Sequence, residues 1–118
     1  RRTDGDCPRR HRVKPVRLRP RARQDRRDEV RYYRDEAGIR VAEKLVRTLE
    51  KALHTIAENP AIGSPALGRE LGIDGPRTWL IDGFPLAFWY IERETHVDVV
   101  RLVGQRQDAL QIDPDETT

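Results

Sequence analysis

Three cations and one phenol between residues 77 and 106 are of the types that act on a phosphate group. They are Arg77, Tyr90, Arg101 and Arg106. Cleavage of RNA by its own 2′-hydroxyl needs cations that stabilise the phosphorane, a proton donor such as a phenol, and a base. A convincing base is missing, because Lys51 is the last lysine and His96 is the only histidine near these residues. The four residues would form a catalytic set only in a ribonuclease, and binding is the simpler interpretation.

Each of these residues also has a purely structural interpretation. The arginines can form ion pairs with Asp82, Asp98 or Asp108, and exposed pairs of this kind contribute only about 0–1 kcal/mol. Tyr90 can be a packed strand residue whose hydroxyl reaches the rim. Asp108 can fix the chain end by pairing with an arginine. The sequence leaves the functional and the structural interpretations open.

No metal site, cofactor site or internal disulfide is expected. His54 and His96 are well separated and lack further ligands around them, and Cys7 is the only cysteine. No apolar run approaches the roughly 18–20 residues that span a membrane, and the start shows no signal-peptide pattern. We therefore expect a soluble, cytoplasmic protein that uses neither a cofactor nor a membrane partner.

The charge is distributed unevenly along the chain. Residues 1–34 carry a net charge of +9 and residues 35–118 carry −6, which together give the +3 of the whole sequence. A basic block can bind nucleic acid, dock an acidic partner or simply be solvated. The length suits one domain. We expect that domain at 14–110, after a basic, disordered or non-native extension at 1–13 and before a flexible acidic tail at 111–118.

Hydrophobic periodicity predicts a strand followed by two helices. The expected ranges are 14–19 for the strand, 20–37 for the first helix and 39–59 for the second. Pro20 is suited to the first position of a helix, because its missing N–H costs nothing there. Gly38 is suited to the position after a helix, and Pro60 stops the second apolar stripe. So short a link predicts an antiparallel helical hairpin.

Three more strands are expected after a loop rich in glycine and proline. The expected ranges are 77–81, 84–92 and 95 or 96 to 103, with a turn of helix at 67–71 in the loop before them. Asp82 and Gly83 are typical of a two-residue primed hairpin turn. Pro85 lacks a ladder donor, so we expect it at the start of its strand. The predicted fold is α+β: an N-terminal strand and an antiparallel helical hairpin packed on a small, mainly antiparallel sheet.

The order and spacing of several motifs resemble one known family. The residues that carry the resemblance are Pro20, Ala22, Asp25, Tyr32, Tyr33, the segment Asn59 to Gly63, Gly75, Arg77, the segment Gly83 to Pro85, Tyr90, Arg101, Arg106 and Asp108. Together they span about residues 14–108. The chain resembles the ParE branch of the RelE/ParE toxins, a plasmid stabilisation family of bacterial type II toxin-antitoxin modules.

The resemblance implies a toxin that a cognate, ParD-like antitoxin neutralises in a hetero-oligomer. ParE-type members inhibit DNA gyrase, whereas RelE-type relatives on the same fold cut messenger RNA on the ribosome. Gly104 stands where many ParE-like chains have a histidine, and residues 105–110 lack the tyrosine that RelE-like ribonucleases carry near their end. With no base near the arginines, these departures favour inhibition of gyrase by binding over catalysis. The alternatives are a ribosome-dependent endoribonuclease and a non-toxic relative that only binds an antitoxin.

The resemblance also divides the candidate residues between two roles. Target contact is expected of Arg77, Tyr90, Arg101, Arg106 and Asp108. Antitoxin contact is expected of Arg23, Arg27, Arg31, Arg34, Trp79 and Trp89. The helix arginines are otherwise a solvated face, and the two tryptophans are otherwise core residues.

Overall fold

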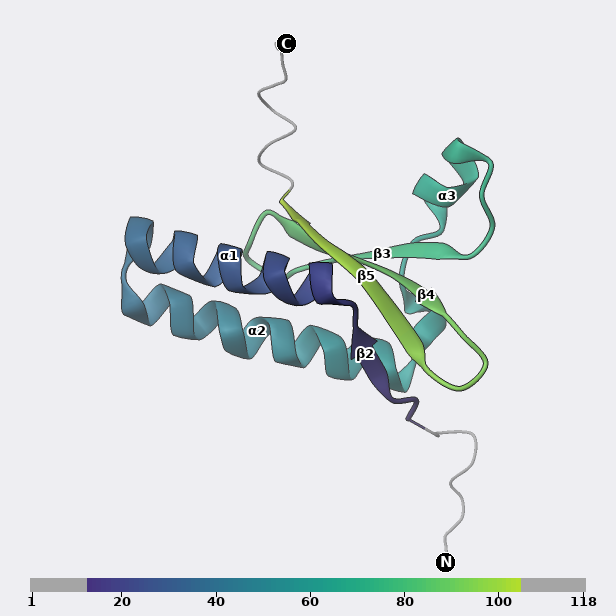
Figure 1. The fold of residues 1–118 in the computed structure, drawn as a ribbon, viewed down its shortest axis with the longest axis horizontal. Helices are drawn as coiled ribbons and strands as arrows, with labels where there is room; N and C mark the ends of the chain where they lie inside the picture. The colour runs from purple at the N-terminus through teal and green to yellow at the C-terminus, as the bar shows by residue number, and fades with distance from the viewer. Residues whose placement is uncertain (1–12, 105–118) are drawn as a thin grey trace, which may run out of the picture.

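A helical hairpin packs against one face of a four-stranded sheet (Figure 1). The computed structural model describes residues 13–104. The elements in chain order are β2 (Val16–Leu18), α1 (Pro20–Ala37), α2 (Ile39–Glu58), the 3-10 helix η2 (Pro60–Ile62), α3 (Ala66–Leu71), β3 (Pro76–Leu80), β4 (Leu86–Glu92) and β5 (Val97–Gly104). The predicted α+β class and its helical hairpin are confirmed.

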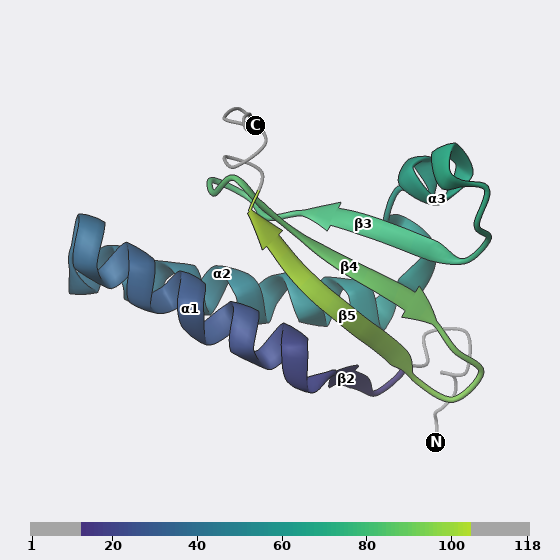
Figure 2. The same cartoon turned by 45° about the horizontal axis from the view of Figure 1, so that its top comes forward.

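The sheet is mixed, with one parallel pair in an otherwise antiparallel ladder. The strand order is β2-β5-β4-β3, so β4 is central, as its apolar residues on both faces predict (Figure 2). β2 runs parallel to β5, and the helical hairpin and two further strands provide the long crossover that a parallel pair needs. A register shift between Trp89 and Tyr90 marks a bulge in the pairing of β4 with β5.

The bounds of the first helix are those that its end residues predict. Pro20 is the first residue of α1, and the helix ends at Ala37. Gly38 follows with a φ of 98°, a backbone angle that residues with a Cβ rarely adopt. The second helix is one residue shorter than expected: Asn59 lies just outside it and donates its backbone N–H to the carbonyl of Thr55 at 3.1 Å.

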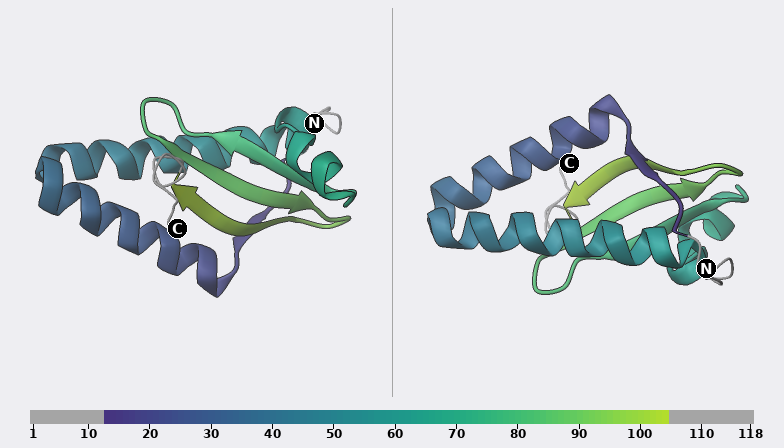
Figure 3. Two further views of the ribbon diagram at one scale, coloured as in Figure 1. Left: turned by 90° about the horizontal axis from the view of Figure 1, so that it is seen from above. Right: turned by 90° about the horizontal axis from the view of Figure 1, so that it is seen from below.

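The core lies between the helical hairpin and the sheet. The two views of Figure 3 show α1 and α2 on the same face of the strands. From α2, Leu45, Leu49 and Ile56 are buried, and they pack with inward residues of the central strands such as Phe88 and Val99. Burial of one such side chain contributes about 1.5–3 kcal/mol. The apolar stripe of α2 therefore anchors the hairpin to the sheet.

The connection between β3 and β4 differs from the predicted two-residue turn. Residues 81–85 lie between the two strands. Ile81 N–H bonds to the carbonyl of Leu86, and Phe84 N–H closes a turn onto the carbonyl of Ile81. Gly83, with a φ of 81°, is the left-handed residue of that turn. Pro85 lies just before β4 and so outside the ladder, where its missing donor costs nothing.

The ends of the chain lie outside the described residues. They include all but the last residue of the expected extension at 1–13, and the whole of the expected tail at 111–118. Arg106 and Asp108 belong there as well. In the part that the structure describes, no helix is long and apolar enough to cross a membrane.

Candidate functional site

Arg77 and Tyr90 meet at the loop that follows α2. They are partners in the register of β3 and β4. The guanidinium of Arg77 donates to the carbonyls of Gly63 at 2.7 Å and Ala61 at 3.2 Å. The Tyr90 hydroxyl accepts the N–H of Gly63 at 2.8 Å and donates to the carbonyl of Pro60 at 2.7 Å. The two residues thus hold the loop against the sheet through its backbone.

The contact between this loop and the sheet leaves no spare space. A Cβ on Gly63 would overlap the ring and hydroxyl of Tyr90 and come within 2.9 Å of the Thr78 carbonyl. Tyr90 itself is fully buried. Burial raises the pKa of its phenol above the ordinary value near 10, so the hydroxyl stays protonated and keeps its bond to Pro60. A bound macromolecule therefore cannot contact the Tyr90 side chain directly. Tyr90 can affect binding only through the shape of the loop to which it is hydrogen-bonded.

Arg101 is held by a carboxylate of the first helix. Its Nε lies 2.7 Å from Oδ2 of Asp25, and the same oxygen accepts the backbone N–H of Leu102 at 3.1 Å. Asp25 is only 9% exposed. The ion pairs expected from the sequence involved Asp82, Asp98 or Asp108, whereas the observed partner lies 76 positions away on α1. This contact ties α1 to the part of β5 that β2 does not cover.

Asp98 is a second buried carboxylate, and it forms ion pairs as the sequence suggested, but with Arg19 and Arg93 instead of the arginines expected there. Arg19 donates to both of its oxygens, with a shortest distance of 2.7 Å, and Arg93 donates at 3.2 Å. The hydrogen bonds from Arg19 hold the pKa of Asp98 below its usual value, against the opposing effect of burial. The same contact raises the pKa of Arg19. The pair fastens the junction of β2 and α1 to the start of β5.

Arg77 and Arg101, the two predicted cations that the structure describes, are not assembled into one phosphate site. Arg77 turns to the loop beside the edge strand β3, and Arg101 turns to α1 beside β5. Each is already bound to backbone carbonyls or to a carboxylate. Among residues 13–104 no group of three metal-ligating side chains occurs either. Arg106 and Asp108 lie outside the described residues, so their roles stay predictions.

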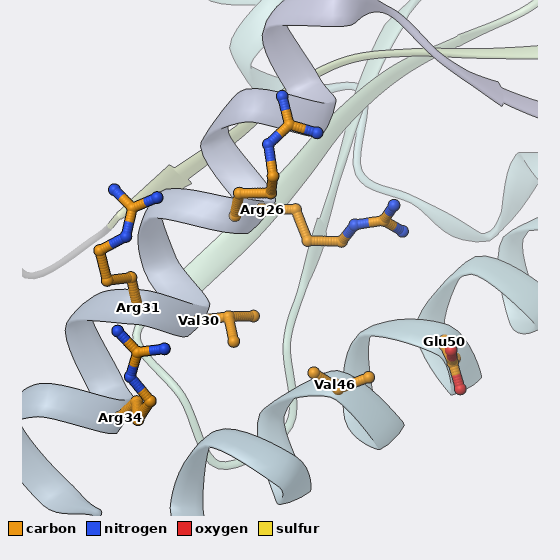
Figure 4. A pocket seen from close by; sticks show the side chains of 7 residues that line it. Arg26, Val30, Arg31, Arg34, Val46 and Glu50 are labelled. Atoms are coloured by element: carbon orange, nitrogen blue, oxygen red, sulfur yellow. The ribbon is translucent and has the colours of Figure 1, made fainter. Parts of the chain in front are cut away.

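Three of the four helix arginines expected to contact the antitoxin line one hollow. It measures about 430 Å³ and is lined by Arg26, Arg27, Val30, Arg31, Arg34, Val46 and Glu50. In Figure 4, Val30 of α1 and Val46 of α2 lie on the two sides of this hollow. We call it the arginine groove. Arg23 is not part of its lining; it donates to the carbonyl of Leu18 at 2.8 Å.

The ion pairs of the groove arginines are local and exposed. Arg31 lies 3.7 Å from Asp28, and Arg34 lies 3.4 Å from Asp35. All four side chains are more than half exposed, and pairs of this kind are worth at most about 1 kcal/mol. A stronger acidic partner can therefore replace these contacts. The groove combines the apolar pair Val30 and Val46 with arginines on its α1 side and Glu50 on its α2 side.

The two tryptophans belong to different surfaces. Trp79 packs against the core cluster on the helix side of the sheet. Trp89 lines a hollow of about 160 Å³ whose walls are wholly apolar, together with residues of α3 such as Leu67 and Leu71. Trp79 is therefore a partly buried core residue, as its structural interpretation predicts, and it also lines two hollows beside β3. A single partner would have to contact opposite sides of the sheet to reach both rings.

Comparisons with known proteins agree with this architecture. Residues 16–109 match the family model described as the ParE toxin of the type II toxin-antitoxin system, parDE. A solved structure of the chromosomal ParDE toxin-antitoxin system from P. aeruginosa superposes with a TM-score of 0.67 at 15% identity, covering 78% of this chain and 96% of that one. A comparison with curated proteins gives no match. Since the family model covers most of the chain, the protein belongs to the ParE toxins of type II toxin-antitoxin systems.

Proposed function

We propose that this ParE toxin inhibits DNA gyrase by binding it, and that a cognate ParD-like antitoxin neutralises the toxin. Membership of the family supports the toxin role. The choice of binding over catalysis rests on one observation. The Tyr90 hydroxyl, the best proton donor of the sheet, is buried and bonded to Pro60 and Gly63. It is not free to protonate a leaving oxygen.

The sheet arginines support the same proposal. A ribonuclease needs cations and a base within reach of one phosphate. Arg77 and Arg101 point to different parts of the molecule, and both already have partners. His96 lies in the turn before β5, where its ring contacts Thr95. The described residues therefore favour a protein that inhibits its target by binding it through a surface. Arg77 then contributes by fixing the conformation of the loop 59–64.

The antitoxin surface is the arginine groove. Arg27, Arg31 and Arg34 line the same hollow as the apolar pair of Val30 and Val46, on its α1 side. An amphipathic segment with acidic residues at its margins would bury its apolar side on this pair and replace the weak local ion pairs. Antitoxin binding there would place a partner segment along the groove between α1 and α2.

The gyrase assay tests the proposal directly. The purified toxin, freed from antitoxin, is incubated with DNA gyrase and relaxed plasmid, and both supercoiling and trapped double-strand cleavage are scored. We expect supercoiling to stop and cleaved DNA to accumulate. Unaffected gyrase at a large molar excess of folded toxin would refute the gyrase half of the proposal. Cleavage of messenger RNA on ribosomes would then point to the endoribonuclease alternative.

Two arginine variants sharpen this assay. Arg77→Ala removes the bonds to Gly63 and Ala61, so the loop loses its clamp and gyrase inhibition should fall by about tenfold or more. Arg69→Ala removes an exposed arginine of α3 for which no ion pair is recorded in the described part of the chain, and inhibition should stay unchanged. Equal activity of both variants would exclude the loop clamp from the target-binding function.

A further inference from the structure

Asp25 of α1 lies against the stretch of β5 that has no strand beside it. β2 pairs with β5 only from Val97 to Val99, so the backbone of β5 beyond that point needs another partner on this side. Asp25 supplies one, because its Oδ2 accepts the N–H of Leu102 at 3.1 Å. As a partner for the strand edge alone, this side chain would need an acceptor oxygen but no charge.

The same carboxylate also fixes a guanidinium. Oδ2 of Asp25 accepts Nε–H of Arg101 at 2.7 Å, and Oδ1 lies 3.4 Å from Nη2. Both contacts use one edge of the planar guanidinium, which has five donors in all. Its Nη1 has no hydrogen-bond partner among residues 13–104, and the side chain is 37% exposed. Asp25 thus orients the group and leaves a second edge free to bind.

Arg101 arises from the sheet face opposite the helical hairpin. It pairs with Trp89 across β4 and β5, and such cross-strand partners share a face. Phe88 and Leu102, the neighbouring pair, belong to the core under the helices. The bulge in this ladder leaves Val100 beside Trp89, where both line the apolar hollow of about 160 Å³. An oriented cation therefore adjoins an apolar hollow.

The local charge favours an acidic partner. Arg21 lies 3.5 Å from Asp25, one turn before it on α1. Two arginines therefore share one carboxylate, and the trio retains one uncompensated positive charge. A nucleic-acid backbone is bound by several cations along its phosphates, whereas here one oriented guanidinium adjoins apolar walls. A protein carboxylate with an aliphatic neighbour fits this combination, because a carboxylate can accept two parallel bonds from one guanidinium edge.

We infer that Asp25 is a positioning residue for target binding: it holds Arg101 so that the free guanidinium edge binds a carboxylate of gyrase, while an aliphatic neighbour of that carboxylate enters the hollow at Trp89. This inference rests on the proposed inhibition of gyrase and adds which face of the toxin meets the target. An oriented arginine loses less side-chain freedom on binding than an unrestrained one. The inference also assigns Trp89 to the target surface, instead of the antitoxin surface expected from the sequence.

The test compares two buried carboxylates. Asp25→Asn keeps an oxygen that can accept the N–H of Leu102, but it loses the charge that holds Arg101. Asp98→Asn is the matched control, because Asp98 is 8% exposed and also accepts hydrogen bonds from arginines. The readout is the toxin concentration that halves gyrase supercoiling, measured where circular dichroism shows both variants folded. Asp25→Asn should raise it about fivefold or more, and Asp98→Asn less than about twofold.

A double-mutant cycle separates positioning from a structural role. Arg101→Gln removes the guanidinium and should raise the half-inhibiting concentration about tenfold or more. Adding Asp25→Asn to Arg101→Gln should change nothing further, because no guanidinium is left to orient. Trp89→Ala should weaken inhibition of gyrase about fivefold or more, while its affinity for the antitoxin, measured by calorimetry, stays within about twofold of the unmodified toxin.

Three outcomes would overturn the inference while gyrase inhibition stands. Additive losses in the cycle, or equal losses for Asp25→Asn and Asp98→Asn, would leave Asp25 with a structural role alone. A loss of antitoxin affinity without a loss of inhibition in Trp89→Ala would return that ring to the antitoxin surface. Binding of a short DNA duplex by the unmodified toxin, lost in Arg101→Gln, would assign the guanidinium to a phosphate. If the unmodified toxin leaves gyrase active, the proposed function itself fails, and this inference fails with it.

Discussion

At the scale of single residues, the polar side chains with the most partners hold the fold together. Asp25 joins α1 to β5, Asp98 joins the start of α1 to β5, and Tyr90 joins β4 to the loop after α2. Each satisfies several groups at once, which buried polar atoms require. If a substitution of one of these residues abolishes toxicity, the stability of the variant must be measured before the loss is assigned to target contact.

Replacing Asp98 by asparagine should destabilise the protein in a pH-dependent way. The variant loses charge-assisted hydrogen bonds from Arg19 and Arg93, which should lower the free energy of unfolding by about 1–3 kcal/mol at pH 7. The folded pKa of Asp98 is depressed. The stabilisation is therefore fully present above the unfolded pKa near 3.9 and is lost as pH falls through the folded value. Urea unfolding between about pH 7 and pH 3 measures this difference.

An exposed aspartate provides the control for this series. Asp74 lies in the loop before β3, and Asp74→Asn should leave the free energy of unfolding within about 0.5 kcal/mol at each pH. A difference between Asp98→Asn and the unmodified protein that persists undiminished at the acid end would contradict a carboxylate role. The substitution would then act through packing alone.

Replacing Tyr90 by phenylalanine tests the opposite end of the pH scale. The variant leaves the N–H of Gly63 and the carbonyl of Pro60 without their partner, which should cost about 1–3 kcal/mol. Burial raises the pKa of Tyr90 in the folded protein. Its stabilisation is therefore complete below the unfolded pKa near 10 and declines as pH rises above it. Thermal or urea unfolding at about pH 7 to 11 should show the two proteins converging at the alkaline end, and a constant gap would contradict the burial of a protonated phenol.

At the scale of elements, the loop 59–64 is one rigid unit with the sheet. Gly63→Ala should be destabilising, because its Cβ would overlap Tyr90 and press on the Thr78 carbonyl. Part of that overlap is with the hydroxyl, so Gly63→Ala should cost less in a Tyr90→Phe background. Gly72→Ala should lower the free energy of unfolding by about 1–2 kcal/mol, because only the φ of 71° disfavours a Cβ there. The loss should be the same with Tyr90 and with phenylalanine at that position. A double-mutant cycle by urea unfolding measures the coupling; strict additivity for Gly63 would contradict the contact.

Local sequence signals predicted the elements far better than the contacts between them. Pro20 and Gly38 act on their own backbone, so the bounds of α1 follow from the sequence. The predicted two-residue turn after β3 is wrong, because Phe84 and Pro85 delay the ladder until Leu86, and that delay depends on how the turn closes. The pairing of Arg101 with Asp25 depends on the packing of α1 beside β5, which no spacing along the chain encodes.

At the scale of the whole molecule, the arginine groove and an apolar hollow lie on opposite faces of the sheet. The arginine groove lies on the helical hairpin, whereas the hollow beside Trp89 lies on the other face of the sheet and has apolar walls. The lining of the arginine groove holds four arginines and one glutamate, so the positive charge is concentrated at the groove although the net charge of the chain is only +3. Charge on that side should govern how fast and how tightly an acidic partner binds.

Salt dependence of antitoxin binding tests this distribution of charge. Affinity should fall between about 0.05 and 0.3 M salt, because exposed charges are screened over this range. The double variant Arg27→Ala with Arg31→Ala removes two cations of the arginine groove. It should bind about tenfold more weakly at low salt and lose less affinity as salt is added. Calorimetric titrations at several salt concentrations give both quantities.

The matched control removes the same charge elsewhere. Arg17 lies on β2 and Arg69 on α3, and both are exposed and outside the groove lining. Arg17→Ala with Arg69→Ala therefore has the same net charge as the groove variant. If net charge alone attracted the partner, the two double variants would lose affinity equally at every salt concentration. A loss confined to the groove variant requires the partner to lie against Arg27 and Arg31, because screening leaves distant charges little influence beyond about 10 Å.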